Sequence, residues 1–136
     1  MKKSNSLSNS KNLFKPRNLE SRTKIYNEIL KNYLITYPFL KDLYYLIVDD
    51  EEGILNEDEL YVVANSENEA IDCVKKYLNE KYSYFDLVIE SITIYPLSND
   101  VQKIEELLAK FWSEAKLNKF KTWLKIYKIY HYHWEP

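Results

Sequence analysis

Glycine and cysteine are nearly missing from this chain, and each scarcity excludes a class of site. The 136 residues include a single glycine, Gly53, and a single cysteine, Cys73. Cradles that hold phosphate by close backbone approach use several glycines, so Walker-type and dinucleotide-binding motifs are excluded. One cysteine allows neither an intramolecular disulfide nor a thiolate-rich zinc site, and it favours a reducing compartment. We therefore expect a cytoplasmic protein.

Long apolar runs are missing as well. The longest, residues 43–48, is far shorter than the ~18 residues that a transmembrane helix needs. The N-terminus lacks the apolar stretch of a secretory signal. A chain of this length with 46% hydrophobic and 29% charged residues is typical of one globular domain. We expect no membrane association.

Positive and negative charges are distributed unevenly along the chain. The first 24 residues hold seven basic residues and one acidic residue, which leaves twelve basic and twenty acidic residues in the remainder. Residues 1–20 show no helical or strand period, so they are predicted to form a disordered basic tail before a domain that spans residues 21–136. An organellar targeting segment is an alternative for this tail.

The spacing of apolar residues predicts an α+β domain with the order α-β-β-α-β-α-β. Helices are predicted from Ser21 to the residue before Pro38, over 66–79 and over 99–115, and strands over 43–48, 60–64 and 87–95 with a bend at 90–91. The first two strands should pair as a hairpin. Ser66 and Glu69 form a capping box at the second helix, and Ser98 or Asn99 is expected to cap the third. The natural arrangement is a mostly antiparallel sheet of three to four strands with helices packed on one face.

The C-terminal segment, residues 122–134, fits both a helix and a strand. Its tyrosine, isoleucine and tryptophan content favours a strand. On a strand, Leu124 and Ile126 would face the core. The opposite, exposed face would then carry Trp123, Lys125, Tyr127, His131 and His133.

No catalytic constellation can be assembled from these residues. Both histidines lie near the C-terminus, and no serine is marked as a nucleophile by a tight turn. His131 and His133 could begin a metal site, but a third ligand would have to come from Cys73 or a carboxylate. Cys73 itself is expected to be a small buried hydrophobe. We expect a non-enzymatic protein without a metal or cofactor.

The connection between the first two strands is strongly acidic. Asp50, Glu51 and Glu52 precede Gly53. A calcium loop with its glycine at Gly53 would need an acid where Val48 stands, so the spacing does not fit. The connection is either a solvated turn or a mimic of nucleic-acid phosphate that enters a basic groove of a partner.

Aromatic side chains are abundant, with 13 tyrosines and 15% aromatic residues. Interfaces use tyrosine and tryptophan anchors within a polar rim, so a small acidic domain of this kind fits a non-enzymatic protein-binding module. We predict that a protein partner contacts the exposed C-terminal residues named above together with Asp50, Glu51 and Glu52. The alternative is a nucleic-acid-binding accessory protein that uses the basic tail and the lysine- and aromatic-rich C-terminal strand.

No family signature is present. The stretch Val63-Ala64-Asn65-Ser66-Glu67-Asn68-Glu69-Ala70 resembles, in a general way, small accessory proteins of phages and other mobile elements, including inhibitors of host defence. This resemblance implies a regulator or inhibitor that acts on a protein partner.

Overall fold

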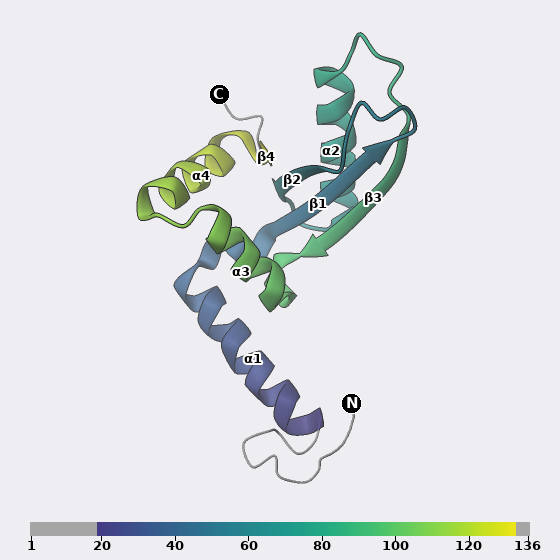
Figure 1. Ribbon diagram of the computed structural model, residues 1–136. Coiled ribbons are helices and arrows are strands. Elements are labelled where there is room, and N and C mark those ends of the chain that lie inside the picture. The colour runs from purple at the N-terminus through teal and green to yellow at the C-terminus, as the bar shows by residue number, and fades with distance from the viewer. Residues whose placement is uncertain (1–18, 133–136) are drawn as a thin grey trace.

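The structure is a computed structural model that describes residues 19–132, with side chains from Ser21 onward. Its helices are α1 (Leu19–Thr36), α2 (Glu67–Lys81), α3 (Val101–Lys110) and α4 (Glu114–Tyr127), with short 3-10 turns η1 (Pro38–Asp42) and η2 (Leu97–Asn99). Its strands are β1 (Leu43–Asp50), β2 (Asp58–Val63), β3 (Ile89–Pro96) and β4 (Ile129–His131) (Figure 1). The predicted tail lies outside the described residues except for Leu19 and Glu20, which begin α1.

The four strands form one antiparallel sheet in the order β3-β1-β2-β4. The predicted hairpin is confirmed, with Leu46 opposite Leu60. Helix α2 then carries the chain across the sheet, so β3 pairs with the far side of β1. Asp49 opposes Ser91 while Asp50 opposes Ile89, which leaves Glu90 as the extra residue of a bulge. The predicted bend in this strand falls at the same place.

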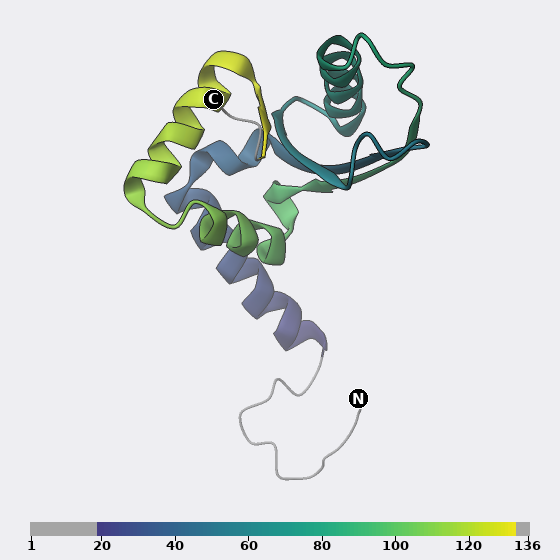
Figure 2. The ribbon, with the colours of Figure 1, turned by 45° about the horizontal axis from the view of Figure 1, so that its top comes forward.

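The predicted α+β class is confirmed, but the helices cover both faces of the sheet and not one. Tyr45 and Tyr61 belong to a core cluster with α3 and α4, whereas Leu46 and Leu60 belong to a second cluster with α2. Figure 2 shows α2 on one side of the sheet and α3 on the other. Alternate residues of a strand point to opposite faces. Because the residues that point to each of the two faces are mostly apolar here, helices must pack on both faces of the sheet.

The start of α2 follows the predicted capping signal. The Oγ of Ser66 accepts a hydrogen bond from the N–H of Glu69 at 3.1 Å. The Glu69 carboxylate in turn accepts from the N–H of Asn65, one residue earlier than in the usual capping box. Ala70, Val74 and Leu78 form the buried stripe of the helix.

The third predicted helix is two helices, and its predicted caps are wrong. Asp100 caps α3 by accepting from the N–H of Lys103 at 3.0 Å, whereas Ser98 and Asn99 lie in η2. The helix ends at Lys110, and Ser113 caps a new one by accepting from the N–H of Lys116 at 3.1 Å. A second cap three residues after a helix end marks the start of a new helix, which apolar spacing alone does not show.

The predicted strand over residues 122–134 is wrong for most of its length. Helix α4 continues to Tyr127, and only residues 129–131 form a strand. Leu124 is buried as predicted, but Ile126 is 64% exposed, because buried positions on a helix recur at spacings of three and four, as at Phe120 and Leu124. Packing of these two residues outweighs the preference of tyrosine, tryptophan and isoleucine for strands.

Candidate functional site

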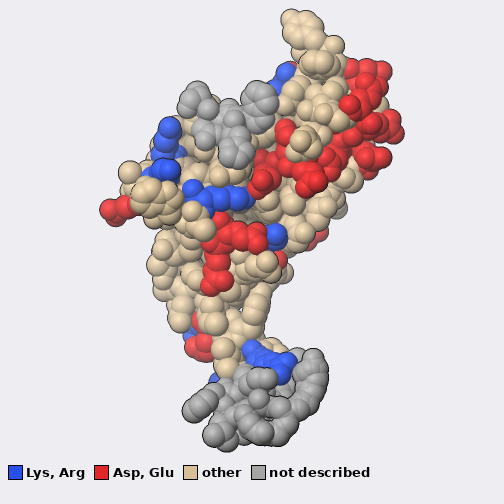
Figure 3. Space-filling model, in the orientation of Figure 1, with Lys and Arg blue, Asp and Glu red and all other residues tan. Residues whose placement is uncertain are grey.

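Two connections form an acidic end of the molecule. The β1–β2 connection lies beside the α2–β3 connection, where the N–H of Glu51 donates to the carbonyl of Val88 at 3.0 Å. Residues 49–59 and 80–90 together hold ten acidic residues and one basic residue, Lys81. Figure 3 shows this concentration of acidic side chains at the end of the sheet where the two connections lie. We call these two stretches the acidic end.

The β1–β2 connection is held in place by its own carboxylates. The Asp50 carboxylate is buried and accepts from the N–H of Leu55 at 2.7 Å and of Glu52 at 3.2 Å. Asp49 accepts from the N–H of Glu57 at 2.7 Å. Burial acts to raise the pKa of the Asp50 carboxyl, but the surrounding backbone N–H groups outweigh it and keep that pKa below its ordinary value. Asp50 therefore organises the loop, while Glu51 and Glu52 are exposed.

Exposed apolar and aromatic residues lie in the α2–β3 connection of the acidic end. Tyr84 is 99% exposed and Phe85 is 56% exposed, with Val88 close by in sequence and 47% exposed. The N–H of Phe85 donates to the carbonyl of Tyr82 at 2.9 Å, which fixes a turn at the end of α2. Tyr84 and Phe85 are not among the residues that the sequence predicts for a partner surface. The available signal was two adjacent aromatics in a polar connection just after a helix ends.

The structure separates the residues predicted as one C-terminal surface. Trp123 is half-buried and donates its Nε1–H to the carbonyl of Ile129 at 2.9 Å. Tyr127 is 56% exposed and packs against Trp123, with the rings tilted by 44° and a centroid distance of 4.5 Å. Lys125 is exposed. On a helix, residues two positions apart do not face each other, so Lys125 points away from both Trp123 and Tyr127. Only Trp123 and Tyr127 therefore share a face.

His131 is buried and already has two partners. It is 4% exposed; its Nε2 lies 2.8 Å from Asp58 Oδ2 and its Nδ1 lies 3.1 Å from the Tyr77 hydroxyl. An Asp–His pair beside a hydroxyl can activate a nucleophile, but here the histidine is buried and the hydroxyl is the phenol of Tyr77. Burial raises the pKa of Tyr77 to about 12, so this phenol stays protonated. The three side chains join β2, α2 and β4.

Metal binding finds no support in the described residues. His133 lies outside them, and residues 19–132 contain no group of three or more potential histidine, cysteine or carboxylate ligands.

A second charged cluster ties α3 to the sheet. Lys110 donates to Glu59 and, at 2.9 Å, to the Tyr61 hydroxyl. Tyr45 donates to the same Glu59 carboxylate at 2.6 Å. Burial, followed by this hydrogen bond, raises the pKa of Tyr45. These polar groups satisfy one another, so the cluster serves packing and presents no open site.

A hollow rimmed by lysines lies between α4, η1 and the end of β2. Its volume is about 310 Å³, and we call it the lysine hollow; it is lined by Phe39, Asp42, Val63, Lys121, Leu124, Lys125 and Lys128. The apolar residues form most of its surface, while the ammonium of Lys121 lies 5.5 Å from the centre of the Phe39 ring.

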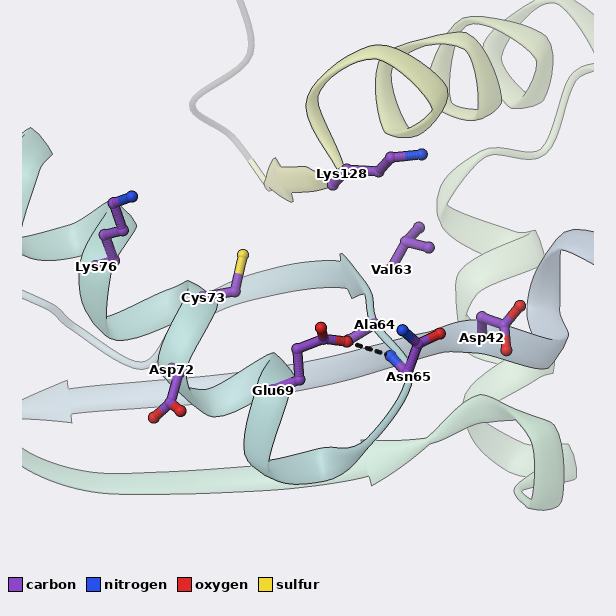
Figure 4. Close-up of a pocket in the computed structure, with 9 residues that line it drawn as sticks. All are labelled: Asp42, Val63, Ala64, Asn65, Glu69, Asp72, Cys73, Lys76 and Lys128. Carbon is purple, nitrogen blue, oxygen red and sulfur yellow. Dashed lines mark hydrogen bonds between the residues drawn. The ribbon is translucent and has the colours of Figure 1, made fainter.

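A larger groove of about 600 Å³ adjoins the lysine hollow and shares Asp42, Val63 and Lys128 with it. Figure 4 shows Cys73 of α2 beside this groove, with carboxylates and lysines around it. Burial, reinforced by the charge of Glu69, raises the pKa of the Cys73 thiol. A thiol with a raised pKa is a weak nucleophile. The groove therefore lacks an activated group.

Comparisons of this chain with known protein families, curated proteins and solved structures gave no match. Within the part of the chain that the structure describes, none of the helices has the length and apolar character that crossing a bilayer requires. The acidic end and the lysine hollow are thus the features from which a function can be argued.

Proposed function

We propose that this protein is a small non-enzymatic protein-binding module, a regulator or inhibitor whose acidic end docks on a basic segment of a protein partner. The observation that carries the proposal is the exposure of Tyr84 and Phe85 at the acidic end, next to the exposed carboxylates of its two connections. Binding hot spots are commonly aromatic anchors surrounded by polar residues. A basic partner would match the rim in charge and cover the anchors.

The rigidity of the acidic end supports this proposal. Binding costs free energy for every side chain and loop that becomes ordered. The carboxylates of Asp49 and Asp50 already fix the β1–β2 connection through backbone N–H groups, and Glu51 ties it to the neighbouring connection. Little ordering of these loops is left for a partner to impose. The concentrated negative charge would also speed encounter with a basic surface.

Affinity capture from a lysate of the source cells tests the proposal when three baits are compared with and without nuclease. The baits are the full chain, Tyr84→Ser/Phe85→Ser, and Trp112→Ser. Trp112 is 74% exposed and lies outside the acidic end, so its variant is a matched control for loss of an exposed aromatic. We expect a protein partner that persists after nuclease, is lost by the double variant and is kept by the control.

The purified partner then allows a quantitative test. Tyr84→Ala should weaken binding by about tenfold or more, or ~1.4 kcal/mol, as expected for an aromatic anchor. Glu51→Lys/Glu52→Lys should mainly slow association and reduce its dependence on salt. Unchanged affinity in the Tyr84 variant would refute the assigned surface.

Nucleic-acid binding is the second candidate function, and the lysines of α4 favour it. Residues 114–128 contain five lysines and one acidic residue, Glu114. Lysines that neutralise phosphates give affinities that fall steeply with salt. Loss of all captured protein after nuclease treatment, together with recovery of bound nucleic acid, would favour this candidate over the first.

A further inference from the structure

The lysine hollow has lysines on its rim, and the acidic end carries mostly carboxylates, so the two surfaces are complementary in charge. We propose that the protein associates head to tail, with Tyr84 and Phe85 of one copy seated in the lysine hollow of the next. This contact uses Tyr84 and Phe85 as anchors, so in that respect the proposal rests on the proposed function. It goes further because a second copy of the chain occupies the lysine hollow.

The hollow has the features that an aromatic anchor with an acidic rim requires. Its volume of about 310 Å³ falls at the small end of ligand pockets, which suits one or two rings. Val63 and Leu124 supply apolar contact. Lys121 and Lys125 are exposed on successive turns of α4, where they can meet carboxylates or lie over an incoming ring.

Lys128 closes the hollow from a fixed position. It caps the C-terminus of α4 in the left-handed conformation, with φ of 66°. Its N–H donates to the carbonyl of Leu124 and its carbonyl accepts from the N–H of Val63, both at 2.9 Å. The backbone of the rim is therefore set by α4 and β2 before any ligand arrives.

The acidic end supplies the matching half. Tyr84 and Phe85 project from the α2–β3 connection, and the exposed carboxylates of Glu51, Glu52 and Asp86 lie in the two connections that form this end. Seating the two rings in the hollow would bring these carboxylates toward the lysines on its rim. Apolar contact and ion pairing would then stabilise the same interface.

One copy cannot make this contact with itself. Strand β1 begins directly after Asp42, which lines the hollow, and ends at Asp50 in the acidic end. Its eight residues separate the two surfaces by roughly 25 Å.

Contact between unlike surfaces is heterologous, so it extends into a chain of copies or closes into a ring. A formal net charge of −2 leaves little overall repulsion to oppose it.

Sedimentation velocity of the full chain over a range of concentrations and salt tests the proposal. We expect species larger than a dimer at low salt and dissociation at high salt, because exposed ion pairs are screened. The hollow variant, Lys121→Glu/Lys125→Glu, and the loop variant, Tyr84→Ser/Phe85→Ser, should each raise the dissociation constant by about tenfold or more. The control Lys116→Glu/Lys119→Glu makes the same charge change at exposed lysines outside the hollow and should keep the association.

Mixing the two variants provides the decisive measurement. The hollow variant keeps its acidic end, and the loop variant keeps its lysine hollow, so an equimolar mixture can form one contact only. We expect a one-to-one dimer that does not grow further, with both variants retaining the unfolding midpoint of the unmodified chain. A full chain that stays monomeric at low salt, a mixture that stays monomeric, or a control variant that dissociates equally would overturn the proposal.

The outcomes separate this proposal from the proposed function. If the full chain is monomeric while the hollow variant still captures the protein partner, only head-to-tail association fails. If association occurs but the loop variant captures the partner as well as the unmodified chain does, the proposed partner surface fails and the self-contact stands.

Discussion

Phe120→Ala should remove the side chain that joins α4 to the aromatic core. Phe120 is 1% exposed. Its ring centroid lies 4.3 Å from that of Phe111, 5.0 Å from that of Tyr130 and 5.3 Å from that of Tyr61. These partners come from the end of α3, from β4 and from β2. A cavity at Phe120 would therefore loosen three elements at once.

The free energy of unfolding should fall by ~4 to 5 kcal/mol in this variant. Truncation of a buried phenylalanine costs about 3 to 5 kcal/mol. Each aromatic pair adds roughly 0.5 to 1.5 kcal/mol beyond area burial, and three close pairs place the loss at the upper end. Phe120→Leu keeps most of the apolar volume and loses only the ring pairing, so its cost should be about 1 to 2 kcal/mol.

Urea unfolding followed by circular dichroism measures these losses. The midpoint should fall strongly for Phe120→Ala and modestly for Phe120→Leu, with little change in the slope. Trp112→Ala, at a 74% exposed position, should change stability by less than about 0.5 kcal/mol. A loss below ~1.5 kcal/mol for Phe120→Ala, or an equal loss for Trp112→Ala, would refute the docking of α4 described above.

Three further predictions concern the same fold. Leu124→Ala should cost about 2 to 5 kcal/mol while Ile126→Ala, at an exposed position, should cost less than about 0.5 kcal/mol; equal unfolding midpoints would contradict the helix. Ser66→Ala should cost about 1 kcal/mol through loss of the N-cap, and an unchanged midpoint would mean that the cap adds no stability. Burial raises the pKa of Tyr77 to about 12 and also raises that of Tyr61, so the folded state keeps protons that the unfolded state releases from about pH 10 upward. Stability should be full below that pH and fall as pH rises toward 12; melting temperatures measured across this range should decline, less steeply in Tyr77→Phe, and a flat profile would count against the buried phenols.

Much of the fold could be predicted because its signals are local. The hairpin follows from two apolar runs separated by an acidic connection that contains Gly53, whose φ is 78°. The start of α2 follows from Ser66 and Glu69, which act within one helical turn. Such signals depend on few neighbours, so they survive the step from sequence to tertiary structure.

The error at α4 has the opposite origin. Residues 122–127 contain threonine, tryptophan, isoleucine and tyrosine, which favour strands when taken alone. What decides the conformation is the packing of Phe120 and Leu124 against the sheet, together with a cap at Ser113 outside the segment. Helices in proteins owe most of their stability to such packing. A prediction restricted to the segment could not include it.

The candidate surfaces were predictable only in part for a related reason. Composition alone marked the acidic connection with Glu51 and Glu52. The position of Tyr84 and Phe85 beside it depends on β3 returning next to β1, a pairing between residues about forty positions apart that no local pattern specifies. A different long-range pairing, that of β4 with β2, places His131 near Asp58 and Tyr77, where it is buried and not exposed as predicted.

The two surfaces impose a testable relation between self-association and partner binding, because both use the acidic end. If a fraction of copies has this end seated in a neighbour's lysine hollow, only the remaining fraction can bind a basic partner. The apparent dissociation constant for the partner is then the intrinsic constant divided by that remaining fraction. Partner affinity measured by titration should therefore weaken as the concentration of the unmodified chain is raised. The variant Lys121→Glu/Lys125→Glu keeps the acidic end but has lost the hollow, so its partner affinity should be independent of its own concentration. Equal concentration dependence in both proteins would show that the hollow does not compete for the acidic end.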